Sequence, residues 1–273
     1  MAKNVSYSTE NFIPLFTEGS KRILYIGGGD GNLIQILSDL NPELEIVGID
    51  GVAMFSYTLK EFAERFPHFD FNNHTLEGIV GGVVMGTIQP FDCVIFNHSL
   101  HNISSYDRYN PHREEPIAFA LEDACKCLVP GGKLVIRDGI FTDSGWLEKA
   151  TLKNKEDVDF LKIFTLAYHA YDRIEYEICE DGMSFVMQWR YMKEFFEKLA
   201  NGSDTFKSEV EKQYGILTED AWRRIVESKD FHICHCMNSC EDYYEKLKDK
   251  VQTEGNMRSL LSDMSILICA EKG

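Results

Sequence analysis

Residues 21–32 read Lys-Arg-Ile-Leu-Tyr-Ile-Gly-Gly-Gly-Asp-Gly-Asn, and this stretch decides the fold. Its apolar run, 22–26, is typical of a buried parallel strand. Gly27, Gly29 and Gly31 then crowd into a sharp turn, and Asn-Leu-Ile-Gln-Ile-Leu opens a helix. Because glycine has no Cβ, the backbone N–H groups of such a turn can approach a ligand closely. The stretch therefore predicts a strand, a turn and a helix that bind a cofactor.

A carboxylate suited to a ribose follows downstream. Asp50 ends a second apolar run, 44–49. Its two oxygens can accept hydrogen bonds from both hydroxyls of a ribose. The dinucleotide fingerprint Gly-x-Gly-x-x-Gly needs a third glycine where this chain has Asn32. The strand, the turn and the acid thus predict a nucleoside-binding half-site, and the glycine spacing disfavours a nicotinamide or flavin cofactor.

Further motifs follow in a recognisable order. The spacing Gly27-x-Gly29-x-Gly31 comes first, and Asp50 second. Phe-Asp-Cys-Val-Ile-Phe (91–96) and Leu-Val-Pro-Gly-Gly-Lys-Leu (128–134) come third and fourth. Together they resemble the class I S-adenosylmethionine (SAM)-dependent methyltransferases, from the first strand to about residue 140. The resemblance implies an α/β fold with a doubly wound, mostly parallel seven-stranded sheet, SAM as the cofactor and methyl transfer as the activity.

The resemblance also implies roles for single residues. The three glycines would cradle the methionine end of the cofactor, with Asp30 beside them in the turn, and Asp50 would hold the ribose. Glu77 follows the expected third strand, where the family often places a polar group near the adenine. The residues that we assign to cofactor binding are Gly27, Gly29, Asp30, Gly31, Asp50, Glu77 and Asn97.

Two other functions stay open. The turn Gly-Gly-Gly-Asp-Gly (27–31) also resembles spermidine synthase-like aminopropyltransferases, which carry an aspartate-rich segment after the fourth strand. Here that segment reads Asn-His-Ser-Leu-His-Asn (97–102) and contains no acid, which disfavours aminopropyl transfer. The second alternative is a protein that binds SAM without methylating, as a regulatory or partner subunit.

Two histidines after the fourth strand are the candidates for catalysis. Methyl transfer to a hydroxyl or ammonium acceptor needs a base with a pKa of about 7. We predict His101 as this base and His98 as the second choice, because they lie three apart and could share one face of a helical turn. Asp138, where the fifth strand ends, could orient a histidine, bind a substrate amine or cap a helix. The same three side chains could instead hold a metal ion, but we expect none.

The composition of the chain limits the classes of molecule that it is expected to bind. The chain has 273 residues, 44% of them hydrophobic, and a net charge of −16. No run of Lys and Arg is long enough for a nucleic-acid-binding patch. No stretch of 18 apolar residues or signal-peptide pattern is found. We therefore expect a cytoplasmic protein whose acceptor is a small molecule, neutral or cationic, without nucleic acid or membrane partners. The resemblance to the methyltransferases implies that an oxygen or nitrogen of this acceptor receives the methyl group. A homodimer stays open.

The chain divides into a core and an inserted cap. We expect a SAM-binding α/β core over 1–141, an α+β cap over 142–228, and last strands over 229–273 that complete the core. The expected core helices are 8–16, 31–40, 52–66 and 114–128, and the expected core strands are 22–26, 44–49, 69–75, 91–96, 132–137, 231–236 and 265–270. In the cap, helices are expected at 157–171, 191–199 and 219–228. The strands 173–179 and 183–189 flank Asp181-Gly182, which is a strong hairpin signal.

Overall fold

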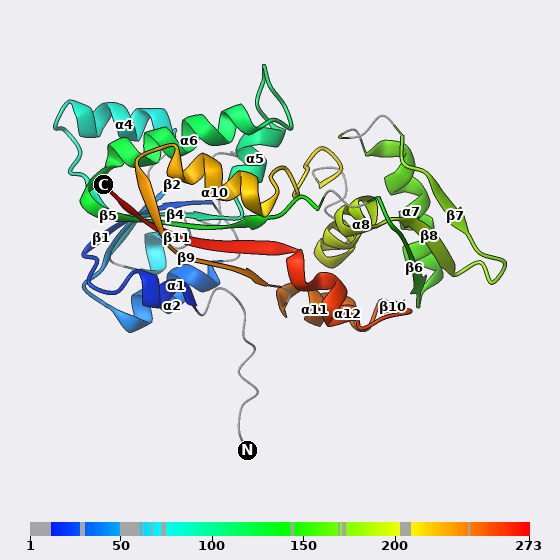
Figure 1. Cartoon of the computed structure of the whole chain (residues 1–273). Coiled ribbons are helices and arrows are strands. Elements are labelled where there is room, and N and C mark those ends of the chain that lie inside the picture. The colour runs from blue at the N-terminus through cyan, green and yellow to red at the C-terminus, as the bar shows by residue number, and fades with distance from the viewer. Residues whose placement is uncertain are drawn as a thin grey trace.

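A seven-stranded sheet forms the larger of two lobes (Figure 1). The computed structural model describes residues 12–27, 31–49, 61, 63–66, 68–71, 75–142, 145–168, 170, 173–202, 209–239 and 241–273. The strand order is β3-β2-β1-β4-β5-β11-β9. The strands are β1 (Arg22–Ile26), β2 (Glu45–Ile49), β3 (Phe69–Phe71), β4 (Phe91–Asn97), β5 (Leu128–Gly139), β9 (Phe231–Ser239) and β11 (Ser265–Lys272).

The pairing confirms the doubly wound, mostly parallel sheet. From β3 to β5 the neighbours run parallel, whereas β11 is antiparallel to both β5 and β9. The order reverses between β1 and β4, which creates the switch point at which open α/β sheets bind ligands. The carboxyl ends of β1, β4 and β5 therefore meet at the same edge of the sheet.

Helices cover both faces of the sheet, which is why its central strands are apolar throughout. On one face lie α1 (Ile13–Phe16) and α2 (Asn32–Leu40), packed on side chains such as Ile95 of β4. On the other face, side chains such as Phe96 pack in a second cluster. Its helices are α4 (Leu76–Val84), α5 (Leu100–Ser105), α6 (Glu114–Cys127) and α10 (Glu219–Glu227).

The second lobe, called the cap here, is built on a four-stranded sheet of order β10-β6-β8-β7. The predicted hairpin is confirmed, because Asp181 accepts hydrogen bonds from the N–H groups of Met183 and Ser184 between β7 and β8. The strands are β6 (Leu147–Leu152), β7 (Tyr176–Ile178), β8 (Ser184–Gln188) and β10 (Val251–Thr253). The helical elements are α7 (Lys155–Ala167), α8 (Trp189–Asn201), α11 (Glu241–Leu247), α12 (Met257–Leu260) and the 3-10 helix η4 (Leu261–Asp263).

The cap differs from its predicted bounds, 142–228, at its carboxyl end. Helix α10 belongs to the core, because its Trp222 is buried there and donates an indole hydrogen bond to the Gly139 carbonyl at 3.1 Å. Conversely, β10 pairs with β6 although it lies after residue 228, and Leu247 of α11 packs in the cap cluster. The expected stretch of last strands, 229–273, therefore contributes to both lobes.

Several element bounds also differ. Helix α7 ends at Ala167 rather than at residue 171, because Tyr168 leaves the helix and donates to Glu194 at 2.8 Å. Strand β5 starts at Leu128, four residues earlier than expected. Of the helix predicted at 8–16, residues 13–16 form α1 and residues 8–11 lie outside the described residues, as does most of the helix predicted at 52–66. Helices α4, α5, α11 and α12 and strands β6 and β10 were not predicted.

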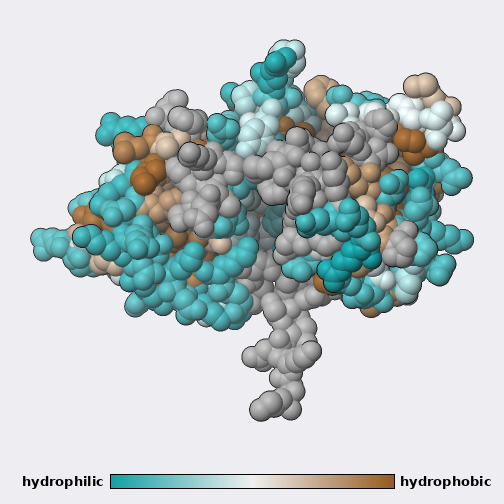
Figure 2. Space-filling view, turned by 180° about the vertical axis from the view of Figure 1, so that it is seen from behind, coloured by the Kyte–Doolittle hydropathy of each residue, from teal (hydrophilic) through white to brown (hydrophobic). Residues whose placement is uncertain are grey.

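Hydrophilic residues prevail on the described surface that Figure 2 shows, and hydrophobic ones lie in small separate patches. This agrees with the large negative net charge. Within the described parts of the chain, no helix combines the length and the apolar character needed to span a bilayer.

Candidate functional site

The glycine turn after β1 is shaped for close approach. Gly27 has φ +123°, and a Cβ there would lie 2.7 Å from the carbonyl oxygen of Asn97. Gly31 has φ +77° and caps α2. Both positions therefore require glycine, and neither places a side chain beside the switch point. Gly29, Asp30 and Asp50 lie outside the described residues, so their roles stay predictions.

Two other residues assigned to the cofactor are described. The Asn97 side chain is buried; its nitrogen donates to Tyr25 Oη at 3.0 Å, and its oxygen accepts from Arg137 at 3.1 Å. This amide thus ties β1, β4 and β5 together just below the switch point. Glu77 is exposed in the first turn of α4. Cofactor contacts of Asn97 and Glu77 remain predictions.

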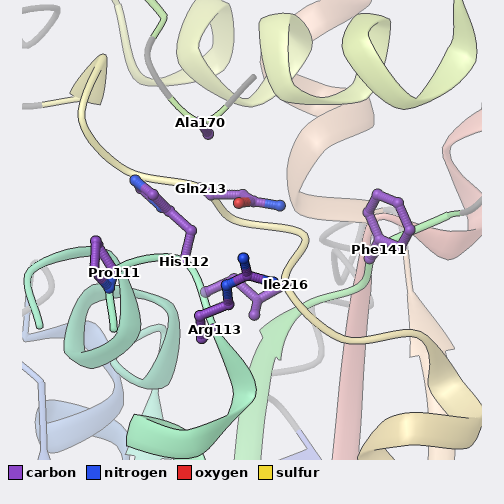
Figure 3. A pocket seen from close by; sticks show the side chains of 7 residues that line it. All are labelled: Pro111, His112, Arg113, Phe141, Ala170, Gln213 and Ile216. Carbon is purple, nitrogen blue, oxygen red and sulfur yellow. The ribbon is translucent and has the colours of Figure 1, made fainter. Parts of the chain in front are cut away.

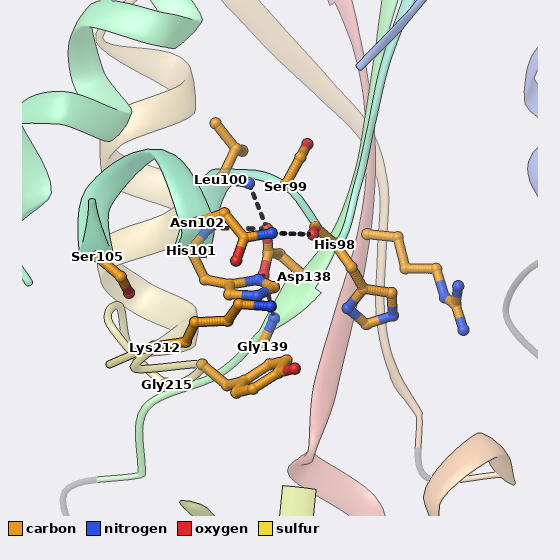
Figure 4. A network of polar contacts seen from close by, with 12 residues as sticks. His98, Ser99, Leu100, His101, Asn102, Ser105, Asp138, Gly139, Lys212 and Gly215 are labelled. Carbon is orange, nitrogen blue, oxygen red and sulfur yellow. Dashed lines mark hydrogen bonds and ion pairs between the residues drawn. The ribbon is translucent and has the colours of Figure 1, made fainter. Parts of the chain in front are cut away.

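His101 and Asp138 form a buried dyad at the carboxyl edge of the sheet (Figure 4). The Nδ1 atom of His101 lies 2.6 Å from Oδ1 of Asp138, and the two side chains are 3% and 0% exposed. The sheet register explains the meeting, because Asn97 at the end of β4 pairs with Arg137 of β5. The residues that follow these two positions therefore emerge side by side.

Asp138 also caps α5, so two of its predicted roles coincide. Its Oδ2 accepts hydrogen bonds from the N–H groups of Leu100 at 2.8 Å and His101 at 3.2 Å, and Oδ1 accepts from Gly139 at 2.8 Å. Burial acts to raise the pKa of Asp138, but His101, His98 and the hydrogen bond from the Gly139 N–H outweigh it, and the pKa lies below the usual 3.8. The carboxylate is therefore ionised at neutral pH and fixes the proton of His101 on Nδ1.

His98 does not share a helical face with His101. It has φ +50° and precedes α5, and the two imidazole rings are 6.4 Å apart at 69°. Burial, together with Arg137, holds the pKa of His98 well below 6.5. The Nδ1 atom of His98 is buried without a hydrogen-bond partner in the described structure. Since this imidazole resists protonation, His98 is the weaker candidate for a base.

The spacing of these side chains also suits a metal ion. Among the described residues, ligand atoms of His98, His101 and Asp138 lie within 4.8 Å of one another. However, the Asp138 carboxylate already accepts four hydrogen bonds, which use its lone-pair positions. The group is thus organised as a hydrogen-bonded dyad.

The cap supplies residues that the sequence analysis missed. The Tyr214 ring stacks on His101 with 4.2 Å between centroids. Glu194 of α8 holds the segment beneath the dyad, because it accepts from the N–H groups of Tyr214 at 3.2 Å and Gly215 at 2.8 Å. The Nζ atom of Lys198, one turn along α8, lies 2.7 Å from Oε2 of Glu194, and this ion pair neutralises the carboxylate. Tyr214 comes from an irregular segment 113 residues after His101 (214 − 101), so no local pattern indicates the contact.

Comparisons with known proteins agree with this geometry. Residues 24–134 match the family model described as a methyltransferase domain. O-methyltransferase 12 of Dictyostelium discoideum is 24% identical over 232 residues, which are 85% of this chain and 51% of that protein. The chain thus spans about half the length of this relative.

Solved structures share the fold at low identity. A SAM-dependent methyltransferase from Mesorhizobium loti has a TM-score of 0.51 and 14% identity, over 92% of this chain and 90% of that one. The [4+2]-cyclase SpnF has a TM-score of 0.52 and 13% identity, over 99% and 84%. Residues 24–134 thus match a methyltransferase domain, in agreement with the strand order of the sheet and with the glycine turn after β1.

Proposed function

We propose that the chain transfers a methyl group from SAM to an oxygen or nitrogen of a small-molecule acceptor, with His101 as the general base. The buried pair of His101 and Asp138 carries the proposal. It lies at the carboxyl ends of β4 and β5, beside the switch point, where ligands of this fold class bind.

The residues present suit the cofactor. A Cβ at Gly27 would meet the Asn97 carbonyl, so only glycine fits at the start of the turn. Its N–H groups and the start of α2 would hold the methionine end, and Asp50 would hold the ribose. When bound, SAM supplies a methyl group on a positively charged sulfur, which is a good leaving group.

The dyad then handles the acceptor's proton. Since Asp138 fixes the proton on Nδ1, the Nε2 lone pair of His101 is free to accept a proton from a hydroxyl or ammonium group. The Asp138 carboxylate stabilises the imidazolium that forms, and stacking on Tyr214 keeps the ring in place. Positioning within an apolar, buried site adds to the rate by holding the acceptor in line with the methyl.

One observation favours a second candidate function. The fold is shared with a protein named for a cyclisation, the [4+2]-cyclase SpnF. A cofactor-binding protein that does not methylate would have the same sheet and glycine turn. In that case the cofactor would bind, and His101 would be dispensable for any turnover.

Methyl transfer from isotopically labelled SAM to a pooled library of phenols and amines distinguishes these functions. We expect label in at least one acceptor, and a loss of about 10²- to 10⁴-fold in His101→Gln, which is the range for a general base. His98→Gln is the matched control and should retain most of the rate. Full activity in His101→Gln would disprove the base assignment, and no transfer despite cofactor binding would favour the second function.

A further inference from the structure

A pocket of about 350 Å³ opens at the seam between core and cap (Figure 3). This volume falls within the range for small-molecule sites. Its polar groups are His112, Arg113 and Gln213, and its apolar walls are Pro111, Phe141, Ala170 and Ile216. Its described lining contains no acidic side chain, although the chain has a net charge of −16. The charge of the described lining is therefore opposite in sign to the net charge of the chain.

The polar groups of the pocket include hydrogen-bond donors that have no partner among the described residues. The Arg113 guanidinium makes no hydrogen bond or ion pair with any residue that the structure describes, and Figure 3 shows the side chain directed toward Gln213. Gln213 uses one amide hydrogen on the Gly215 carbonyl at 2.8 Å, which leaves the second. The Nδ1 atom of His112 is buried without a partner in the described structure, so the other ring nitrogen, Nε2, is the one that could face a ligand. A guanidinium fork beside further donors matches the geometry of a carboxylate.

His112 contributes a hydrogen bond and not a charge. Burial lowers the pKa of this imidazole, with Lys198 acting in the same direction and Glu194 opposing it. The ring is therefore neutral at neutral pH, and Arg113 provides the positive charge of the pocket. His112 also has φ +59°, a conformation that few residues other than glycine adopt and that the surrounding contacts must maintain.

Helix α5 connects the pocket to the dyad. Its last turn holds one wall, because the Ser104 hydroxyl donates to the Arg113 carbonyl at 2.6 Å and the Ser104 carbonyl accepts from the His112 N–H at 3.1 Å. Ser105 holds the other wall by accepting from the Gln213 N–H at 2.9 Å. His101 lies one turn earlier, about 6 Å along the helix axis. The residues that hold the pocket walls thus lie about one helical turn from the proposed base.

We infer that this pocket is the acceptor-binding subsite and that the acceptor is a small molecule with an apolar body and a carboxylate held by Arg113, His112 and Gln213. The inference rests on the proposed methyl transfer and refines it. It also differs from the neutral or cationic acceptor that the net charge suggested, because the charge lining the pocket governs recognition more directly than the distant surface charge does.

Three probes of one shape test the charge preference. Benzoate, benzamide and benzylamine are titrated into the full chain at millimolar concentrations, and binding is followed by the NMR signals of the Gln213 side-chain amide and the Arg113 Nε–H. We expect benzoate to bind at least about threefold more tightly than benzamide, and benzylamine to bind most weakly. Arg113→Gln should erase the preference. Arg224→Gln is the control, since Arg224 is an exposed arginine outside the pocket lining that pairs with Glu114 at 3.6 Å.

Equal binding of the three probes, a preference that survives in Arg113→Gln, or the absence of any shift in these two signals would overturn the inference. S-adenosylhomocysteine is titrated into the same samples to separate the two proposals. If it binds while the probes show no preference, only the carboxylate subsite is wrong. If it does not bind, the proposed function is wrong, and the probe signals still decide the chemistry of the pocket.

Discussion

Replacing Asp138 by asparagine should weaken both the fold and the dyad. The amide keeps the shape of the carboxylate but removes its charge, and Asp138 accepts four hydrogen bonds, including that of His101 Nδ1 at 2.6 Å. A hydrogen bond to a charged group contributes about 1.5–3 kcal/mol. We therefore expect the free energy of unfolding in urea to fall by about 1.5–3 kcal/mol at neutral pH. In ¹⁵N NMR spectra, the fraction of His101 protonated on Nδ1 should also fall.

The pH dependence has a defined sign. The folded-state pKa of Asp138 lies below its usual 3.8, so the stabilisation by the carboxylate is present above 3.8. This stabilisation is lost as the pH falls through the lower folded-state pKa. The difference in free energy of unfolding between wild type and Asp138→Asn should therefore disappear in acid. Asp92→Asn is the matched control, because Asp92 also accepts from two backbone N–H groups, at 2.8 and 2.9 Å, but at the opposite edge of the sheet. An unchanged tautomer and an unchanged free energy in Asp138→Asn would refute the dyad.

Two further changes test the cofactor turn and a buried acid. Gly27→Ala should lower the free energy of unfolding by about 1–3 kcal/mol and weaken S-adenosylhomocysteine binding in calorimetry, because φ is +123° and a Cβ would lie 2.7 Å from the Asn97 carbonyl oxygen. Gly86→Ala, with φ +73° and open space around the Cβ, should lower the free energy alone; equal binding in both variants would contradict the role of Gly27. Both carboxylate oxygens of Glu197 are buried without a partner in the described structure, and burial, with Glu194, raises its pKa well above 4.5. As the pH rises above 4.5, Glu197 ionises in the unfolded chain but stays protonated in the folded chain, which lowers the free energy of unfolding of the wild type. The free energy of unfolding of Glu197→Gln, measured in urea titrations, should therefore rise relative to that of the wild type over this range. Glu209→Gln, which loses the ion pair with Lys212 at 2.7 Å, should be destabilised instead, and a loss of stability in both variants would contradict the account of Glu197.

The core was predictable because its signals are local. Strand β1, the glycine turn and α2 follow one another in the chain, and the local sequences of β1 and α2 favour the structures that they adopt. The meeting of His101 with Asp138 was also within reach, since parallel strands that are neighbours end at the same edge. The conformation of His98 could not be predicted, because its positive φ accompanies the start of α5 and the hydrogen bond of its N–H to the Arg137 carbonyl.

The cap was harder to predict because its contacts are distant in sequence. Strand β10 pairs with β6 about 100 residues earlier, and neither strand alternates strongly between apolar and polar residues. Tyr214 reaches His101 from a segment without regular structure, so only the assembled fold brings them together. The buried charges of α8, such as Glu194 and Lys198, resemble a solvated helical face until their partners are known.

The most direct test of the account is a calorimetric titration of the chain with S-adenosylhomocysteine, with decarboxylated SAM and NADH in parallel. We predict micromolar binding of S-adenosylhomocysteine alone, weakened about 10- to 100-fold in Asp50→Ala, since a hydrogen bond to a charged group contributes about 1.5–3 kcal/mol. Preference for decarboxylated SAM would point to aminopropyl transfer, and binding of NADH alone would contradict the cofactor assignment.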